Sequence, residues 1–199
     1  MQGLDHLEAD GSDTVFRDVI MLALAGFVAI VLLLLPHLNP PTKDQVDRPN
    51  PGNLIVEIRW PDEVDADVDL WVQAMDHRPV GYSNKGGTVF NLLRDDLGLQ
   101  GDFTKLNYEV TYSRGIPEGP YAINVHLYRN KAGIYPVPVS IAISLKRAPQ
   151  ESAREILSKK VDLLHEGQEL TAFRFEIDER ARLVPGSVHD LPTALRSGS

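Results

Sequence analysis

The chain has 199 residues, a formal net charge of −8 and a sequence pI of about 5.2. This length suits one domain of ordinary size and a short additional segment. The acidic balance argues against a nucleic-acid-binding protein, which would present a basic surface. The sequence contains no cysteine, so disulfides give no information about the compartment, although their absence is compatible with an exported domain.

The first 15 residues are polar and contain four acids but no Lys or Arg: Asp5, Glu8, Asp10 and Asp13. A secretory signal peptide would begin with a positively charged region and end at a small-residue cleavage site, and neither pattern is present. We therefore expect residues 1–15 to form a short N-terminal segment that is not cleaved.

An unbroken apolar run without any charge extends from Val19 to Leu35. At about 1.5 Å per residue the run covers roughly 26 Å as a helix, which is close to the thickness of a bilayer's hydrocarbon core. Phe16 and the turn that holds Arg17 and Asp18 extend it to spanning length. Since a chain in lipid must satisfy its own backbone hydrogen bonds, the sequence predicts a single transmembrane helix over residues 16–36.

Asp18 is the unusual residue of this helix. At 100° per residue, Leu22, Ala25 and Ala29 fall within about 40° of it, and the two alanines form a pair of small residues four apart. Such a stripe lets another helix approach closely, so the alignment indicates a helical partner. The alternative is that Asp18 lies at headgroup level near the helix N-terminus, where the helix dipole favours an acid.

The segment Phe16–Leu22, FRDVIML, resembles the F-x-D-V-M-L pattern that opens the transmembrane helix of ExbD and TolR. MotB, the flagellar stator subunit, has a related single helix with one aspartate. The resemblance implies a bacterial inner-membrane protein with a cytoplasmic N-terminus, one helix and a periplasmic domain. It also implies that two copies of the helix lie inside a pentamer of a multi-span MotA-, ExbB- or TolQ-type subunit.

The same resemblance assigns roles to residues of the helix. Asp18 would be the ion carrier, taking up and releasing H⁺ or Na⁺, and Phe16, Leu22, Ala25 and Ala29 would contact the partner. The chain would then be a homodimeric, ion-motive-force-driven motor subunit that needs no cofactor. Its load would be a periplasmic or envelope component.

Of the basic residues near the helix, Arg17 lies before it and Lys43 and Arg48 lie after it. By the positive-inside rule, this small excess weakly favours an N-terminus outside the cytoplasm. We follow the family layout, because so few charges decide little and a long folded domain can translocate regardless of charge. Residues 37–53 are rich in proline and are predicted to be an extended, semi-rigid linker.

From Leu54 onwards apolar residues alternate with polar ones, which is typical of half-buried strands. Strands are predicted over residues 54–60, 68–72, 89–93, 108–112, 121–128, 137–145, 156–164 and 169–177, with the last two forming a hairpin. A short helix over 150–163 is a rival interpretation, since Ser152–Glu155 resembles a capping box. The sequence therefore predicts an antiparallel, all-β sandwich, immunoglobulin- or jelly-roll-like, over residues 54–178, and a loosely ordered tail over 179–199.

Three segments of this region are similar to bacterial exported sandwich domains of the YfaP type: DVDLWV at 67–72, GYSNKGGTVFNLLRDDLG at 81–98 and GPYAINVHLY at 119–128. The resemblance supports the sandwich fold and a periplasmic location for residues 54–178. It implies no particular activity.

The sandwich region also contains a group of six acids: Asp62, Asp65, Asp67, Asp69, Asp95 and Asp96. Acids at EF-hand spacing begin at Asp65, but Leu70 occupies the position where that loop needs glycine, so an EF-hand is rejected. Two interpretations stay open. One is a cation site, with calcium as the ion, that uses Asp65 or Asp67 with Asp95 or Asp96; the other is a solvated acidic strand face.

The sequence shows no catalytic set, because its six histidines are scattered and no serine lies in a G-x-S-x-G context. His126 is expected to be a surface residue on the polar face of a strand. The leading hypothesis is therefore the motor subunit, which is not an enzyme. The alternatives are a membrane-tethered module that binds an envelope polysaccharide or protein, for which Trp71 would suit a sugar platform, and a tethered enzyme.

Overall fold

The computed structural model describes residues 5–38, 53–98, 106–148 and 150–196. It divides into two units, an N-terminal helix and a β domain, and each is described here by itself. Helix α1 (Asp5–Leu38) includes the predicted 16–36 segment and begins earlier than expected. Most of the predicted linker, residues 39–52, lies outside the described residues. Among the helices in the described part of the chain, none combines the length and hydropathy needed to cross a bilayer.

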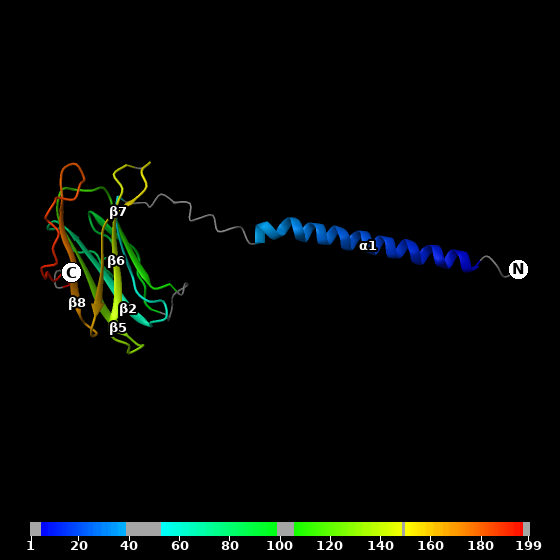
Figure 1. The fold of residues 1–199 in the computed structure, drawn as a ribbon, viewed down its shortest axis with the longest axis horizontal. Helices are drawn as coiled ribbons and strands as arrows, with labels where there is room; N and C mark the ends of the chain where they lie inside the picture. Colours follow the sequence, from blue (N-terminus) through cyan, green and yellow to red (C-terminus); the bar gives the residue numbers. More distant parts are fainter. Residues whose placement is uncertain (1–4, 39–52, 99–105, 149, 197–199) are drawn as a thin grey trace. The chain divides into compact units, whose positions relative to one another are not determined.

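The described part of the β domain holds eight strands, which can be followed in Figure 1. They are β1 (Leu54–Arg59), β2 (Ala66–Ala74), β3 (Phe90–Arg94), β4 (Tyr108–Ser113), β5 (Gly119–Asn130), β6 (Val137–Leu145), β7 (Arg154–Leu163) and β8 (Glu169–Ile177). Each predicted strand is present. The rival helix over 150–163 is excluded, because β7 occupies that stretch.

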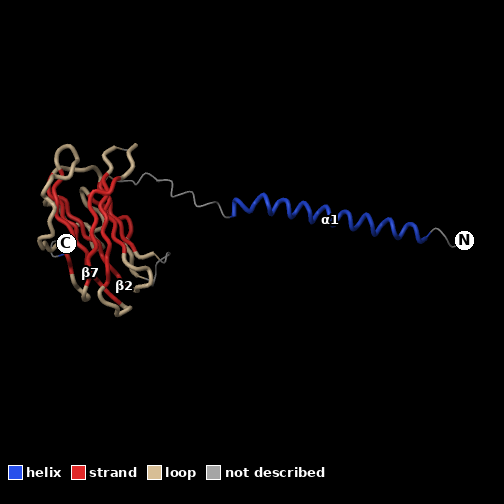
Figure 2. Tube along the Cα trace, in the orientation of Figure 1, coloured by secondary structure: helices blue, strands red, loops and turns tan. Residues whose placement is uncertain are grey.

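The strands form two antiparallel sheets, as the sandwich prediction requires. One sheet has the order β3-β4-β1-β6-β7 and the other has the order β2-β5-β8. Figure 2 shows the strands of the β domain in red and the connecting loops in tan. The predicted hairpin of the last two strands is wrong, because β7 pairs with β6 and β8 pairs with β5 in the other sheet. The connecting turn is bound to β5: the Gly167 amide donates to the Leu127 carbonyl (2.7 Å), and the Leu127 amide donates to the Gln168 carbonyl (3.0 Å).

Alternating apolar side chains from both sheets fill one core. On β2, Val68, Leu70 and Val72 point inward, and Ile123 and Val125 of β5 join them. Burying each such side chain contributes about 1.5–3 kcal/mol relative to exposing it, so the alternation fixes which face of each strand meets the other sheet. The outward face of β2 therefore carries the residues in between, Asp67, Asp69 and Trp71.

The segment after β8 packs against the three-stranded sheet. His189 exchanges backbone hydrogen bonds with Arg174, and the Thr193 amide donates to Thr171 Oγ1 (3.0 Å). Leu195 is 1% exposed and packs with Trp71 and Ala122. The sequence predicts a loose tail here because the side chains are mostly polar, whereas backbone hydrogen bonds and one apolar side chain attach the segment as far as Arg196.

This attachment gives a first prediction. Leu195→Ala should lower the free energy of unfolding of the β domain by about 2–4 kcal/mol, because it removes a buried side chain and leaves a cavity over Trp71. Denaturant unfolding of the full-length protein, followed by tryptophan fluorescence, measures this, since both tryptophans lie in the β domain. Leu191→Ala is the matched control: Leu191 belongs to the same segment but is 62% exposed, so its truncation should change stability by less than about 0.5 kcal/mol.

Candidate functional site

Helix α1 carries all five residues that the sequence assigns to ion transport and partner binding. Asp18, Leu22, Ala25 and Ala29 form one stripe along the helix, and all are exposed in this single chain. Phe16 is also exposed, but it lies about 160° around the helix from Asp18 at 100° per residue. The helix therefore brings four of the five residues to one face and places Phe16 on the opposite side.

In the β domain, the acids of β2 are not a solvated strand face, and that interpretation is wrong. Asp67 is 4% exposed and Asp69 is 3% exposed. Their face of the sheet is covered by loops from elsewhere in the chain. Tyr82 packs edge-on against Trp71 with ring centroids 5.5 Å apart, and a Cβ added at Gly81 would lie only 2.6 Å from the Trp71 ring. This close approach explains why glycine stands at position 81.

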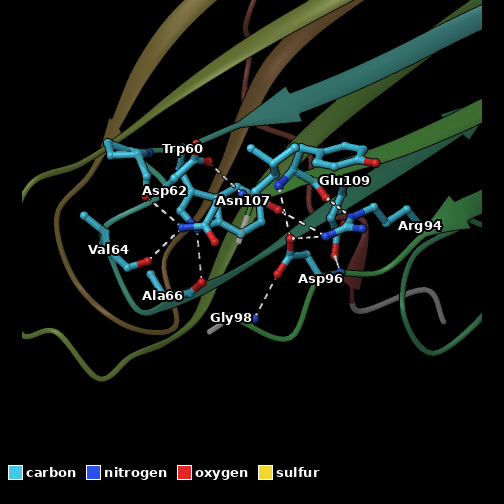
Figure 3. Close-up of polar contacts among 12 residues, drawn as sticks. Trp60, Asp62, Val64, Ala66, Arg94, Asp96, Gly98, Asn107 and Glu109 are labelled. Atoms are coloured by element: carbon cyan, nitrogen blue, oxygen red, sulfur yellow. Dashed lines mark hydrogen bonds and ion pairs between the residues drawn. The ribbon is translucent and has the colours of Figure 1, made fainter. Parts of the chain in front are cut away.

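Two of the six acids hold loops in place (Figure 3). Asp62 Oδ1 accepts the backbone N–H of Asn107 (2.9 Å). Asp96 Oδ1 accepts the N–H of Gly98 (3.0 Å), while its Oδ2 accepts from Tyr108 N (3.2 Å) and from the Arg94 guanidinium (3.1 Å). Both carboxylates thus act as acceptors for backbone donors that would otherwise be buried without partners.

Glu109 of β4 belongs to the same network, although no sequence pattern predicts this. Its Oε2 accepts the backbone N–H of Leu70 (2.7 Å) and its Oε1 accepts that of Asp96 (3.1 Å). Glu109 is buried, as are Thr111 and Ser113 on the same face of β4. Alternation along residues 108–113 identifies a strand, but it suggests that the polar face of this strand is the exposed one. The local sequence therefore does not predict that Glu109 is buried.

His126 is also buried, so the expectation of a surface histidine is wrong. Its Nδ1 lies 2.7 Å from Asp69 Oδ2, and its Nε2 lies 2.7 Å from Nη1 of Arg196. A guanidinium only donates hydrogen bonds, so Nε2 must accept, and Nδ1 then carries the proton that it donates to Asp69. His126 therefore links the β2 carboxylate to the C-terminal segment.

A pocket of about 170 Å³ opens on this side of the domain, lined by three carboxylates, two tyrosines and a leucine: Asp67, Asp69, Asp95, Tyr82, Tyr128 and Leu97. The predicted grouping of Asp67 with Asp95 is thus realised in the pocket lining, whereas Asp69 and the tyrosines were not anticipated. Trp71 is 1% exposed behind Tyr82, so it is not available as a sugar platform in this structure.

The network places several carboxyl groups where their charged forms are disfavoured. Burial raises the pKa of Asp67 to about 7, and the neighbouring Asp69 carboxylate adds to this while Arg129 opposes it. Burial also raises the pKa of Asp69, against the hydrogen bond from His126. Burial raises the pKa of Glu109 well above its ordinary range.

Asp69, Asp95 and Glu109 each place a ligand atom within 4.8 Å of the others, so they are the described residues to test against a metal ion. Both oxygens of Glu109 already accept backbone N–H groups, and Asp69 Oδ2 is bound to His126. Calcium takes six to eight oxygen ligands. The arrangement therefore fits a hydrogen-bonded junction better than a calcium site.

Comparison with known proteins gives no relative: no protein-family model, no curated protein and no solved structure matches the chain. The resemblance of the N-terminal segment to ExbD and TolR rests on the residues Phe16–Leu22.

The raised pKa of Asp67 gives a second prediction. Its carboxyl holds a proton up to about pH 7 in the folded domain but only to about 3.8 when unfolded, so its contribution to stability is lost as pH rises between these values. Asp67→Asn should therefore flatten the fall in melting temperature between pH 4.5 and 8, without abolishing it, since Asp69 and Glu109 act in the same direction.

Thermal unfolding followed by tryptophan fluorescence across this pH range measures the effect. Asp162→Asn is the control, because Asp162 is an exposed acid of β7. It should retain the wild-type slope. An Asp67→Asn protein with the same slope as wild type would show that the Asp67 carboxyl is ionised throughout.

Proposed function

We propose that this chain is the B-type subunit of an ion-driven membrane motor, related in its anchor helix to ExbD, TolR and MotB. Asp18 is the ion carrier, and α1 spans the inner membrane with the N-terminus in the cytoplasm. The β domain, which we expect to be an immunoglobulin- or jelly-roll-type sandwich, is the periplasmic output module. The observation that carries the proposal is the single stripe formed by Asp18, Leu22, Ala25 and Ala29 on α1.

The surface of α1 supports a membrane location. Its described side chains, Val15 to Val31, include eleven large apolar residues that are exposed in this chain: Val15, Phe16, Val19, Ile20, Met21, Leu22, Leu24, Phe27, Val28, Ile30 and Val31. They lie on all sides of the helix, which is typical of a helix surrounded by lipid or by other helices. The apolar run of the sequence continues beyond them to Leu35.

The chemistry of a carboxyl group supports the role of Asp18. In a membrane complex, desolvation favours the neutral form, whereas channel water or a bound cation favours the charged form, so a small rearrangement can change its occupancy. A unit charge that crosses the full membrane potential releases about 2.3 kcal/mol per 100 mV, which can drive a mechanical step. Small side chains at 25 and 29 would let a partner helix lie close to the carboxyl group.

The alternative proposal is a membrane-tethered module that binds an envelope component, with Asp18 incidental. The pocket of Asp67, Asp69, Asp95, Tyr82, Leu97 and Tyr128 favours it, because it is a concave site with several polar groups in the β domain. Ion transport separates the two proposals, since a tethered module would assemble no ion-conducting complex.

The third prediction tests the carrier. Asp18→Asn should insert and assemble normally but reduce ion flux to background, because an amide cannot release a proton or bind a cation as a carboxylate does. Asp18→Glu should retain partial flux. The measurement is H⁺ or Na⁺ uptake into vesicles that contain this chain and a multi-span MotA-, ExbB- or TolQ-type subunit. Wild-type flux in the Asn variant would remove Asp18 as carrier, whereas the absence of flux from the wild-type vesicles would favour the tethered module.

The fourth prediction tests the stripe. Ala25→Leu or Ala29→Leu should abolish co-purification of the multi-span subunit, because a larger side chain blocks close helix packing. Ala23→Leu makes the same change about 140° away from Asp18 and should leave the complex intact. If both stripe variants retain a normal complex, partner helices do not pack on this face.

A further inference from the structure

The pocket beside β2 is the size of a side-chain head group. Its volume of about 170 Å³ is well below the 300–1,000 Å³ of most small-molecule sites. Three of its lining residues, Tyr82, Leu97 and Tyr128, are exposed at the surface. A ligand that enters it must therefore be a small group, presented from outside.

The rim of the pocket is aromatic and supported from behind. The rings of Tyr82 and Tyr128 have centroids 5.9 Å apart, with their planes at 53°. Tyr82 also makes a T-shaped contact with buried Trp71, which packs against Gly81 and Leu195. Aromatic faces held in this way attract organic cations through their quadrupoles, by about 0.5–2 kcal/mol per contact.

The lining of the pocket contains an acceptor without a donor. Oδ1 of Asp95 is buried and has no hydrogen-bond partner among the described residues, while its Oδ2 pairs with Lys85 Nζ at 2.7 Å. Asp67 is buried and meets Arg129 only at 3.5 Å. A buried carboxylate oxygen without a donor is costly, so this position favours the entry of a group that brings both N–H donors and positive charge.

The chain's own arginines approach the same carboxylates from the side. Arg129 Nη2 donates to the Leu97 carbonyl (3.1 Å) beside Asp67, and Arg196 reaches His126, which holds Asp69. The surroundings of the pocket thus already accommodate planar guanidinium groups, which match carboxylate geometry and stack on aromatic rings better than an ammonium group does.

We propose that this pocket binds a basic side chain of a partner polypeptide, with the guanidinium group of arginine as the best fit. The guanidinium stacks on Tyr82 and Tyr128 and donates to Asp67 and Asp95. A metal ion is less suited, because tyrosine rings add nothing to its coordination and Glu109 has both oxygens occupied. The proposal concerns the β domain alone and holds whether or not Asp18 carries an ion.

The experiment is an NMR titration of the full-length protein in detergent micelles with the peptide acetyl-Gly-Arg-Gly-amide, at pH 8, where the Asp67 carboxyl with its pKa of about 7 is ionised. Amide signals of residues around Asp67, Tyr82 and Asp95 should shift. The same peptide with citrulline, a neutral isostere of arginine, should bind at least about 10-fold more weakly. Asp67→Asn and Tyr82→Ala should each weaken binding of the arginine peptide at least about 10-fold, while Tyr82→Phe, which keeps the ring, should retain most of it.

Asp162→Asn serves as the control carboxylate and should bind like wild type. Equal binding of the arginine and citrulline peptides would overturn the proposal, as would wild-type affinity in folded Asp67→Asn and Tyr82→Ala proteins. Calcium chloride alone forms a separate arm. If calcium shifts the same signals and excludes the peptide, the pocket is a metal site and the assignment to a basic side chain is wrong.

Discussion

The carboxylate of Glu109 is the contact on which the acidic side of the β domain depends. β2 is an edge strand of the three-stranded sheet, so amides on its free side need acceptors from outside the ladder. Glu109 comes from the other sheet and accepts the Leu70 amide, and its second oxygen accepts the Asp96 amide. One side chain therefore ties together both sheets and the loop that follows β3. Burying a carboxylate is unfavourable and raises the pKa of Glu109 well above its ordinary range, and the two backbone donors offset this cost only in part.

This junction explains why so many acids gather in one place. Holding the loop against β2 brings Asp95 next to Asp67 and Asp69, where like charges repel. Basic groups from several segments offset this repulsion by forming ion pairs: Lys85 with Asp95, Arg94 with Asp96 and Arg129 with Asp67. These partners come from loops and strand ends, not from one element. The acidic pocket is thus a product of tertiary structure, and its electrostatics depend on contacts far apart in the sequence.

The sequence predicted what depends on local patterns. Alternation identified all eight strands because the side-chain period of a strand is set by neighbours two residues apart. It did not assign β7 and β8 to different sheets, since both sheets produce the same alternation. It also missed the burial of Asp69, His126 and Glu109. Their cover comes from the loop at 94–98 and the segment ending at Arg196, and no local pattern reports which distant segment lies over a polar face.

Helix α1 differs from the β domain in that its large apolar side chains are not buried. Between Val15 and Val31 none of them is covered by another part of the chain as described. Ten of them are Leu, Ile, Phe or Val, each worth about −0.3 to −0.6 kcal/mol on a membrane-insertion scale, or about −3 to −6 kcal/mol together. An aspartate at the centre of a bilayer costs about 2.5–3.5 kcal/mol on the same scale, and less near a helix end. Arg17 can extend its head group towards the interface. In the proposed membrane setting, the unfavourable insertion free energy of Asp18 is therefore smaller than the favourable insertion free energy of the apolar side chains. A partner that offers water or a cation to the carboxyl group would lower the remaining cost. In that setting, the residual cost would couple the charge state of Asp18 to how closely a partner helix packs against Ala25 and Ala29.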